Sequence, residues 1–213
     1  MKRIYTAANF NQDDDLNSLV YQEQLLSQFW LPEEIALSPD LQLWNTLPKD
    51  IRQAYVENLQ VLTLLDTIQG QASVNVVGTS LAPEDHLKRA VYNTMAMFED
   101  NIHAKSYSTI YQTYITPQEI NEIFEWSDNN KNLQTLIKII ADQYEALEKE
   151  TFCRKYAEPT VGDLAYMKLQ WKAAAAAVLL ETYLFYSGFY YPLWFGGQGK
   201  LRGAAEIISL IVR

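Results

Sequence analysis

Apolar residues recur at helical spacing along most of the chain, and this pattern predicts long amphipathic helices joined by short connections. The first long helix is expected to begin at Pro48, and one face of it carries Tyr55, Leu59, Leu62, Asp66 and Gln69. Small and β-branched residues from Gly70 to Ala82 predict a connector. A second long helix is expected over about 83–115.

The remaining segments continue this pattern. Residues 1–28 are polar and predict an arm with a short helix. Thr116 to Glu119 forms a capping box with proline at the first helical position, so a helix is expected to begin there and end near Asn129. Further helices are expected over 131–156, over about 161–190, where Pro192 and the glycines after it end the pattern, and from Gly203 onward.

These elements predict one all-α domain over residues 1–213, since 48% of the residues are apolar and only 8 are glycine and 7 proline. The most apolar run, 173–195, contains Glu181 and Pro192, which predicts a helix buried in protein and no membrane span. A net charge of −9 without a basic cluster argues against nucleic-acid binding. No signal peptide is recognisable and Cys153 is the lone cysteine, so a cytoplasmic protein is predicted.

Three predicted helices each place acidic side chains on an inward face. Glu99, His103 and Tyr107 are four residues apart, so they lie along one helical face, where burial is costly unless they are paired or bound to a metal. Asp66 interrupts an apolar stripe. Glu181 is expected on one face together with Ala174, Val178, Phe185 and either Gly188 or Phe189.

This set makes three-quarters of the carboxylate-bridged dimetal pattern of ferritin-like bundles, which uses one carboxylate from each of two helices and a Glu/His pair from each of two others. Bridging carboxylates offset the repulsion between two cations, and imidazoles complete a donor set suited to Fe or Mn. From the residues alone, His103 could instead be a hydrogen-bonded core histidine and Asp66 a member of a polar network. His86, in a polar first turn, is expected at the surface.

The order of the motifs resembles the small, radical-generating subunit of class I ribonucleotide reductase, specifically the class Ib type. The resemblance is carried along nearly the whole chain by residues 28–34, 62–67, 103–108, 180–181, 185–193 and 199–201. It implies an incomplete ferritin-like bundle with a dinuclear Mn or Fe centre bound by Asp66, Glu99, His103 and Glu181. It also implies a stable radical on Tyr107, used by a large catalytic subunit to reduce ribonucleotides for deoxyribonucleotide synthesis.

The same resemblance implies roles for the surrounding residues. An apolar pocket shielding the radical would consist of Phe185, Phe189 and Ile211, and Trp30 would relay the radical toward the large subunit, although Trp30 by itself most simply packs on the outside of a core. In the class Ib type, a flavodoxin-like protein delivers the oxidant when the metal is manganese.

The sequence departs from the family pattern in two places. The family often has its helix carboxylate three residues before the histidine, which is Asp100 here, but Glu99 shares the face of His103 and is preferred, with a π-bulge adjusting the geometry. The family continues with Asp-Glu-x-x-His, whereas this sequence stops at Arg213. Two explanations are open. Either a longer protein is cut or incompletely represented, or the gene is naturally split and a complementary C-terminal fragment supplies the remaining ligands within a homodimer-type assembly, held by an exposed apolar face of Ile207, Ile208 and Ile211.

Two other functions remain open from the sequence. Without the remaining ligands, the chain would be a non-catalytic scaffold that keeps the bundle and a partner surface. A ferritin-like oxidase would share the metal site without any nucleotide chemistry, and only the resemblance at Trp30 and around Tyr107 argues against it.

Overall fold

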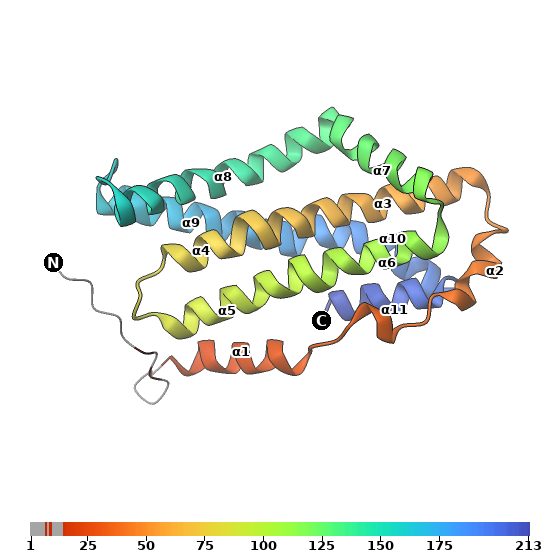
Figure 1. Cartoon of the computed structure of the whole chain (residues 1–213), viewed down its shortest axis with the longest axis horizontal. Coiled ribbons are helices and arrows are strands. Elements are labelled where there is room, and N and C mark those ends of the chain that lie inside the picture. Colours follow the sequence, from red (N-terminus) through yellow and green to blue (C-terminus); the bar gives the residue numbers. More distant parts are fainter. Residues whose placement is uncertain (1–6, 8, 10–14) are drawn as a thin grey trace.

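The computed structural model describes residues 7, 9 and 15–213, and every regular element in that part of the chain is a helix. The long helices run along one axis in an elongated bundle (Figure 1). They are α3 (Lys49–Ile68), α5 (His86–Met97) continued by α6 (Ala104–Tyr114), α8 (Lys131–Tyr156), and α9 (Asp163–Leu179) continued by α10 (Phe185–Gly197). The predicted all-α architecture is therefore what the described residues adopt.

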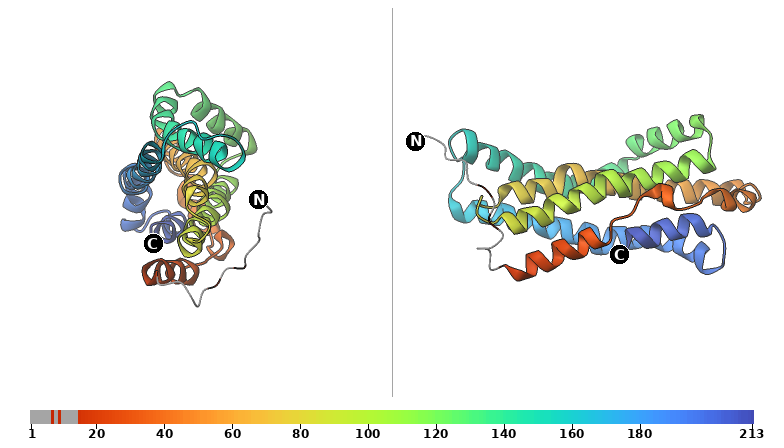
Figure 2. Two further views of the ribbon diagram at one scale, coloured as in Figure 1. Left: turned by 90° about the vertical axis from the view of Figure 1, so that its left-hand side faces the viewer. Right: turned by 60° about the horizontal axis from the view of Figure 1, so that its bottom comes forward.

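The remaining helices surround these long ones. Seen along the bundle, α8 and α1 (Leu16–Ser27) lie on opposite sides (Figure 2). Helix α11 (Arg202–Ile211) turns back along α10. The other elements are 3-10 turns at Pro32–Glu34 and Ser38–Asp40, α2 (Leu41–Trp44), α4 (Val74–Ser80) and α7 (Pro117–Asn129). Helix α7 begins with the predicted capping box of Thr116 and Glu119.

Three π-helical segments interrupt the long helices, at Gln69–Ser73, Phe98–His103 and Leu180–Leu184. The π-bulge expected beside Glu99 is thus present, and two more accompany it. The predicted connector over Gly70–Ala82 was wrong, because the first π segment and α4 continue the helix to Ser80. Val74, Val76 and Val77 are buried there, and burial outweighs the poor helix propensity of β-branched residues.

The π segment Leu180–Leu184 also changes which face of its helix is inward. Each π turn takes an extra residue, so the buried positions shift along the helix. The buried residues are Ala173, Ala176 and Leu180 before the shift and Phe185, Gly188 and Phe189 after it. The prediction that Val178 shares one inward face with Glu181 and Phe185 was therefore wrong, since the Val178 side chain is exposed.

Helix α10 continues through Pro192, where the sequence pattern predicted an end. A proline inside a helix has no N–H to donate to the carbonyl four residues earlier, which here belongs to Gly188. The side chain of Asn58 on α3 donates to that carbonyl oxygen at 2.8 Å. The freed backbone acceptor is thereby satisfied, and the helix extends to Gly197.

The apolar face of α11 was predicted to be exposed, and this prediction was wrong. Ile207 and Ile208 are fully buried and Ile211 is nearly so, because α11 packs on the bundle core. A stripe of large exposed apolar side chains lies instead on α9, α10 and the π segment between them. This apolar stripe consists of Leu164, Met167, Trp171, Val178, Leu179, Tyr183, Tyr186, Tyr190 and Trp194.

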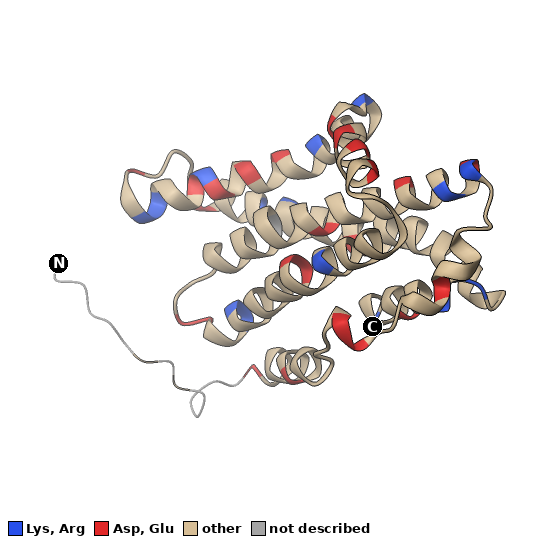
Figure 3. Cartoon of the chain, turned by 45° about the vertical axis from the view of Figure 1, so that its right-hand side comes forward, with Lys and Arg blue, Asp and Glu red and all other residues tan. Residues whose placement is uncertain are grey.

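Charged positions are scattered along the helices, with acidic ones outnumbering basic ones (Figure 3). Among the described residues, no helix combines the length and the apolar character that crossing a bilayer requires.

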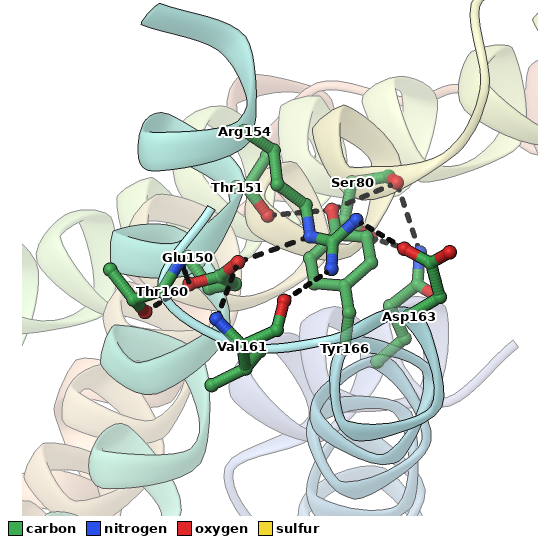
Figure 4. Close-up of polar contacts among 9 residues, drawn as sticks. Ser80, Glu150, Thr151, Arg154, Thr160, Val161, Asp163 and Tyr166 are labelled. Carbon is green, nitrogen blue, oxygen red and sulfur yellow. Dashed lines mark hydrogen bonds and ion pairs between the residues drawn. The ribbon is translucent and has the colours of Figure 1, made fainter. Parts of the chain in front are cut away.

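A buried glutamate near the end of α8, with Arg154 one turn later, connects this helix to the start of α9 (Figure 4). Glu150, 2% exposed, accepts hydrogen bonds from the backbone N–H groups of Thr160 and Val161, at 3.1 and 3.4 Å, and from the Thr160 hydroxyl. Arg154 donates to Glu150 at 3.1 Å, and its guanidinium lies 4.2 Å from the centre of the Tyr166 ring. This network fixes the turn that sends α9 back along α8.

Replacing Glu150 with glutamine is expected to lower the midpoint of thermal unfolding by roughly 5 °C, because an NH₂ group would then face backbone donors. Hydrogen bonds, first from the Thr160 side chain, hold the pKa of Glu150 below its usual value. The Glu150 contribution is therefore complete above pH 4.5 and is lost as the pH falls through the lowered pKa. Circular dichroism melts at pH 7 and pH 3 test this, with the exposed Glu148→Gln as control; equal melting of the Glu150 variant and the native chain at pH 7 would contradict it.

Candidate metal centre

The candidate centre begins with three side chains from two neighbouring helices. Asp66 comes from α3, and Glu99 and His103 come from the π segment between α5 and α6. One ligand atom of each lies within 4.8 Å of those of the other two. His103 Nδ1 is 3.3 Å from Glu99 Oε2 and 3.3 Å from Asp66 Oδ1, and only the Glu99 contact has hydrogen-bond geometry. The structure therefore brings together the predicted pair of Glu99 and His103 and adds Asp66 from the adjoining helix.

Asp66 has the environment of a carboxylate that is short of hydrogen-bond donors. It is completely buried, and neither of its carboxylate oxygens has a hydrogen-bond partner. An isolated buried carboxylate is strongly unfavourable, whereas a coordinated cation would satisfy both oxygens. Two carboxylates and an imidazole are also the donor types that Mn and Fe prefer. These residues fit a metal ion.

Glu181 reaches the same place from the third π segment. It lines a cavity of about 70 Å³ together with Asp66, Glu99 and His103. Its Oε1 accepts a hydrogen bond from Gln69 Nε2 at 2.7 Å. Glu181 lies outside the tight group of three but lines the same cavity.

The protonation of these groups reflects their crowding. Burial raises the pKa of Glu99. Burial and the nearby charge of Glu99 together raise the pKa of Glu181 to about 8. Burial by itself lowers the pKa of His103, but the negative charges of Glu99 and Asp66 outweigh it and raise that pKa. Without a cation, the cluster therefore retains protons that a metal ion would displace.

The π segments place the side chains at this level of the bundle. Glu99, His103 and Glu181 lie within such segments, and Asp66 lies three residues before one. A Cβ atom on Gly70 would be 2.8 Å from the backbone nitrogen of Asp100, so only glycine allows the two helices to approach this closely.

Asp100, the alternative ligand, is outside the group of three. Its Oδ1 accepts a hydrogen bond from the exposed Gln71 at 3.0 Å. His86 is also outside the group and begins α5, with Nδ1 3.3 Å from the Glu84 carbonyl oxygen.

Tyr107 is buried one turn beyond His103. Its side chain is 0% exposed, and its hydroxyl has no hydrogen-bond partner. Burial, followed by the nearby Asp66 charge, raises the Tyr107 pKa well above its ordinary value. The phenol is therefore held neutral in a dry environment.

The other predicted site residues lie around the same cavities. Phe185 and Phe189 stack with ring centres 5.5 Å apart and line the 70 Å³ cavity with Ile211. Trp30 is buried, contrary to its expected place on the outside of the core, and lines an adjoining cavity of about 330 Å³ with Glu99 and His103.

Two residues at the site were not recognised from the sequence. Gln69 was placed on the inward face of its helix without a role, and Tyr144 sits in a helix that offered no candidate chemistry. The only available signal was a polar residue, Gln69, one turn after an inward aspartate.

Comparison with known proteins shows what this arrangement is similar to. The family model for the ribonucleotide reductase small chain matches residues 7–213. A ribonucleoside-diphosphate reductase subunit beta from Bacillus subtilis is 43% identical over 213 residues, which are 100% of this chain and 60% of the relative. The corresponding subunit from Mycobacterium leprae is 37% identical, covering 98% of this chain and 57% of its own length. The chain thus spans about 60% of the length of these relatives.

Solved structures agree with the sequence comparison. The crystal structure of dimanganese(II)-NrdF from Streptococcus sanguinis superposes with a TM-score of 0.83 at 35% identity, covering 99% of this chain and 66% of that one. A ribonucleotide reductase R2 subunit from Clostridium botulinum gives 0.77 at 26% identity, covering 96% and 59%. The predicted ferritin-like helical fold is confirmed by these neighbours.

Proposed function

This chain belongs to the ribonucleotide reductase small-chain family, and from that premise we propose that it acts in a ribonucleoside-diphosphate reductase small subunit. Its part is to bind most of a dinuclear metal centre and to hold a radical on Tyr107. The observation that carries the proposal is the buried Asp66 carboxylate without a hydrogen-bond partner, grouped with Glu99 and His103.

Asp66, Glu99, His103 and Glu181 would bind two Mn or Fe ions, and the centre, when bound and activated, supplies the oxidising power. Tyr107 would give up one electron to the oxidised centre and its phenolic proton to the Asp66 carboxylate, whose charge acts on the phenol, and so become a neutral radical. Its complete burial keeps water away from the radical. Phe185, Phe189 and Ile211, which line the cavity, would exclude water and reductants. The buried Trp30 would connect the site with a large catalytic subunit, where ribonucleotides are reduced.

A dinuclear centre of this type uses more donors than these four side chains. We propose that a complementary C-terminal stretch supplies a second Glu/His pair, within a homodimer-type assembly. A flavodoxin-like activator would serve the centre if it holds manganese, as the dimanganese form of the Streptococcus sanguinis relative supports. The proposed location is the cytoplasm, which suits a chain with one cysteine.

Metal binding by matched variants tests this proposal. Titration of the purified chain with Mn(II), followed by the EPR signal of the free ion, should show a tight site. We expect Glu99→Gln to weaken that site by at least about 100-fold, because it replaces a ligand, whereas outer residues commonly cost 10- to 100-fold. Asp100→Asn should leave the affinity unchanged.

If Asp100→Asn weakened Mn(II) binding and Glu99→Gln left it unchanged, Asp100 would be the ligand. No Mn(II) or Fe(II) binding by the native chain, even with the complementary C-terminal stretch present, would favour the scaffold alternative. Metal binding together with oxidase activity, but without any tyrosyl radical, would favour the ferritin-like oxidase.

A further inference from the structure

A buried amide lies beside the candidate centre and is not one of its ligands. Gln69 is 0% exposed and belongs to the π segment that follows α3. Its Nε2 donates to Glu181 Oε1 at 2.7 Å, across 112 positions of sequence. Its Oε1 accepts a hydrogen bond from the Tyr144 hydroxyl at 3.1 Å. The amide therefore bridges α8 to the wall of the metal cavity.

The hydrogen bonds fix the orientation of this amide. Glu181 in the ionised form that binds a cation can only accept a hydrogen bond, so the Gln69 NH₂ group must face it, and the Gln69 oxygen then faces the Tyr144 donor. Turning the amide over would place two oxygens against each other in a buried site, which is costly. Tyr144 is itself fully buried on α8, so its hydroxyl is a rigid anchor.

We propose that Gln69, anchored by Tyr144, is a positioning residue that holds Oε1 of Glu181 and leaves Oε2 to bind the cation. This inference rests on the proposed metal-binding function. With one oxygen held, Glu181 cannot swing freely between one-oxygen and two-oxygen coordination. Asp66, by contrast, has both oxygens free of hydrogen bonds and is available to bind through either.

The π segment gives Gln69 this role. Gln69 lies three residues after Asp66 and is the first residue of the segment Gln69–Ser73. Gln71, two residues later in the same segment, is exposed and donates to Asp100 at 3.0 Å. Two amides of the same type in one segment thus differ in burial and in partner, which makes Gln71 a matched control.

The test compares Gln69→Leu, Tyr144→Phe and Gln71→Leu with the native chain. Mn(II) titration followed by EPR gives the affinity, and the visible absorption of bound Co(II) reports on coordination. We expect Gln69→Leu to weaken Mn(II) binding 10- to 100-fold and to shift the Co(II) spectrum. Tyr144→Phe should give a smaller change in the same direction, because the amide remains but loses its anchor. Gln71→Leu should match the native chain in both.

Thermal unfolding of the metal-free variants separates positioning from a purely structural role. A lower melting temperature for Gln69→Leu with native Mn(II) affinity and a native Co(II) spectrum would overturn the inference. If Gln69→Leu does not fold, Tyr144→Phe decides, and native binding and spectrum in that variant would overturn it. If Glu99→Gln loses metal binding while Gln69→Leu keeps native binding, this inference alone is overturned. If the native chain binds no metal even with the complementary C-terminal stretch present, the proposed function is overturned as well.

Discussion

Replacing Tyr107 with phenylalanine is expected to abolish the tyrosyl EPR signal completely in the metal-loaded, oxidised assembly that includes the remaining ligands. The change removes a single oxygen atom, which has no hydrogen-bond partner in the structure, so packing should be preserved. The loss would follow because Tyr107 is the tyrosine of α6 whose pKa the charge of Asp66 raises, whereas the pKa values of Tyr111 and Tyr114 are raised by burial without Asp66. Low-temperature EPR after addition of oxidant measures the result.

Tyr111 provides the matched control for this experiment. It lies one turn further along α6 and is equally buried, but its hydroxyl donates to Gln60 Oε1 at 3.2 Å. An amide oxygen is a far weaker proton acceptor than the Asp66 carboxylate whose charge acts on Tyr107, so Tyr111 is less suited to lose its proton. We expect Tyr111→Phe to keep the signal. A signal that survives Tyr107→Phe and disappears in Tyr111→Phe would place the radical on Tyr111 and contradict our proposal.

Replacing Gly203 with alanine is expected to lower the free energy of unfolding by about 3 kcal/mol, the upper end for overpacking. The added Cβ would lie 2.6 Å from the backbone oxygen of Ala36 and 3.0 Å from Asp40 Oδ2. That carboxylate joins three segments, since it accepts hydrogen bonds from Tyr114 Oη at 2.6 Å and from the Ala204 N–H at 3.1 Å. Moving α11 away to relieve the contact would break these bonds. Urea denaturation followed by circular dichroism measures the loss.

Gly197→Ala is the control for this substitution. Gly197 ends α10, and a Cβ there would meet no atom within 4 Å. Its unfolding free energy should therefore stay close to that of the native chain. A Gly203→Ala protein as stable as Gly197→Ala would show that α11 is not held as tightly as the contacts around Asp40 indicate.

Much of the helical framework could be predicted because it depends on local signals. The helix beginning after Thr116 was correctly placed from its capping box, in which the Thr116 side chain and Glu119 exchange hydrogen bonds. The convergence of Glu99 and His103 followed from their spacing of four residues, which the π segment retains. These features rest on neighbours in sequence, so a single sequence contains them.

The errors arose where distant segments decide the outcome. Helix propensity alone could not predict that Val74, Val76 and Val77 are buried in a helix, because the residues that cover them are distant in sequence. The inward shift at Leu180–Leu184 has no pattern of its own, and it moved Val178 to the surface. The Gln69 contact with Glu181 spans 112 positions and cannot be read from either residue's surroundings in sequence.

The three π segments have a consequence for how such a centre can be built. A residue inserted into an α-helix can be absorbed as one wide turn, and the helix on either side keeps its own packing. Here the wide turns occur in the three helices that carry the inward acids. A cation site could therefore be designed into a regular helical bundle by inserting one residue into each helix at the same level along the bundle axis. The helical segments on either side of the insertions would not need a new design.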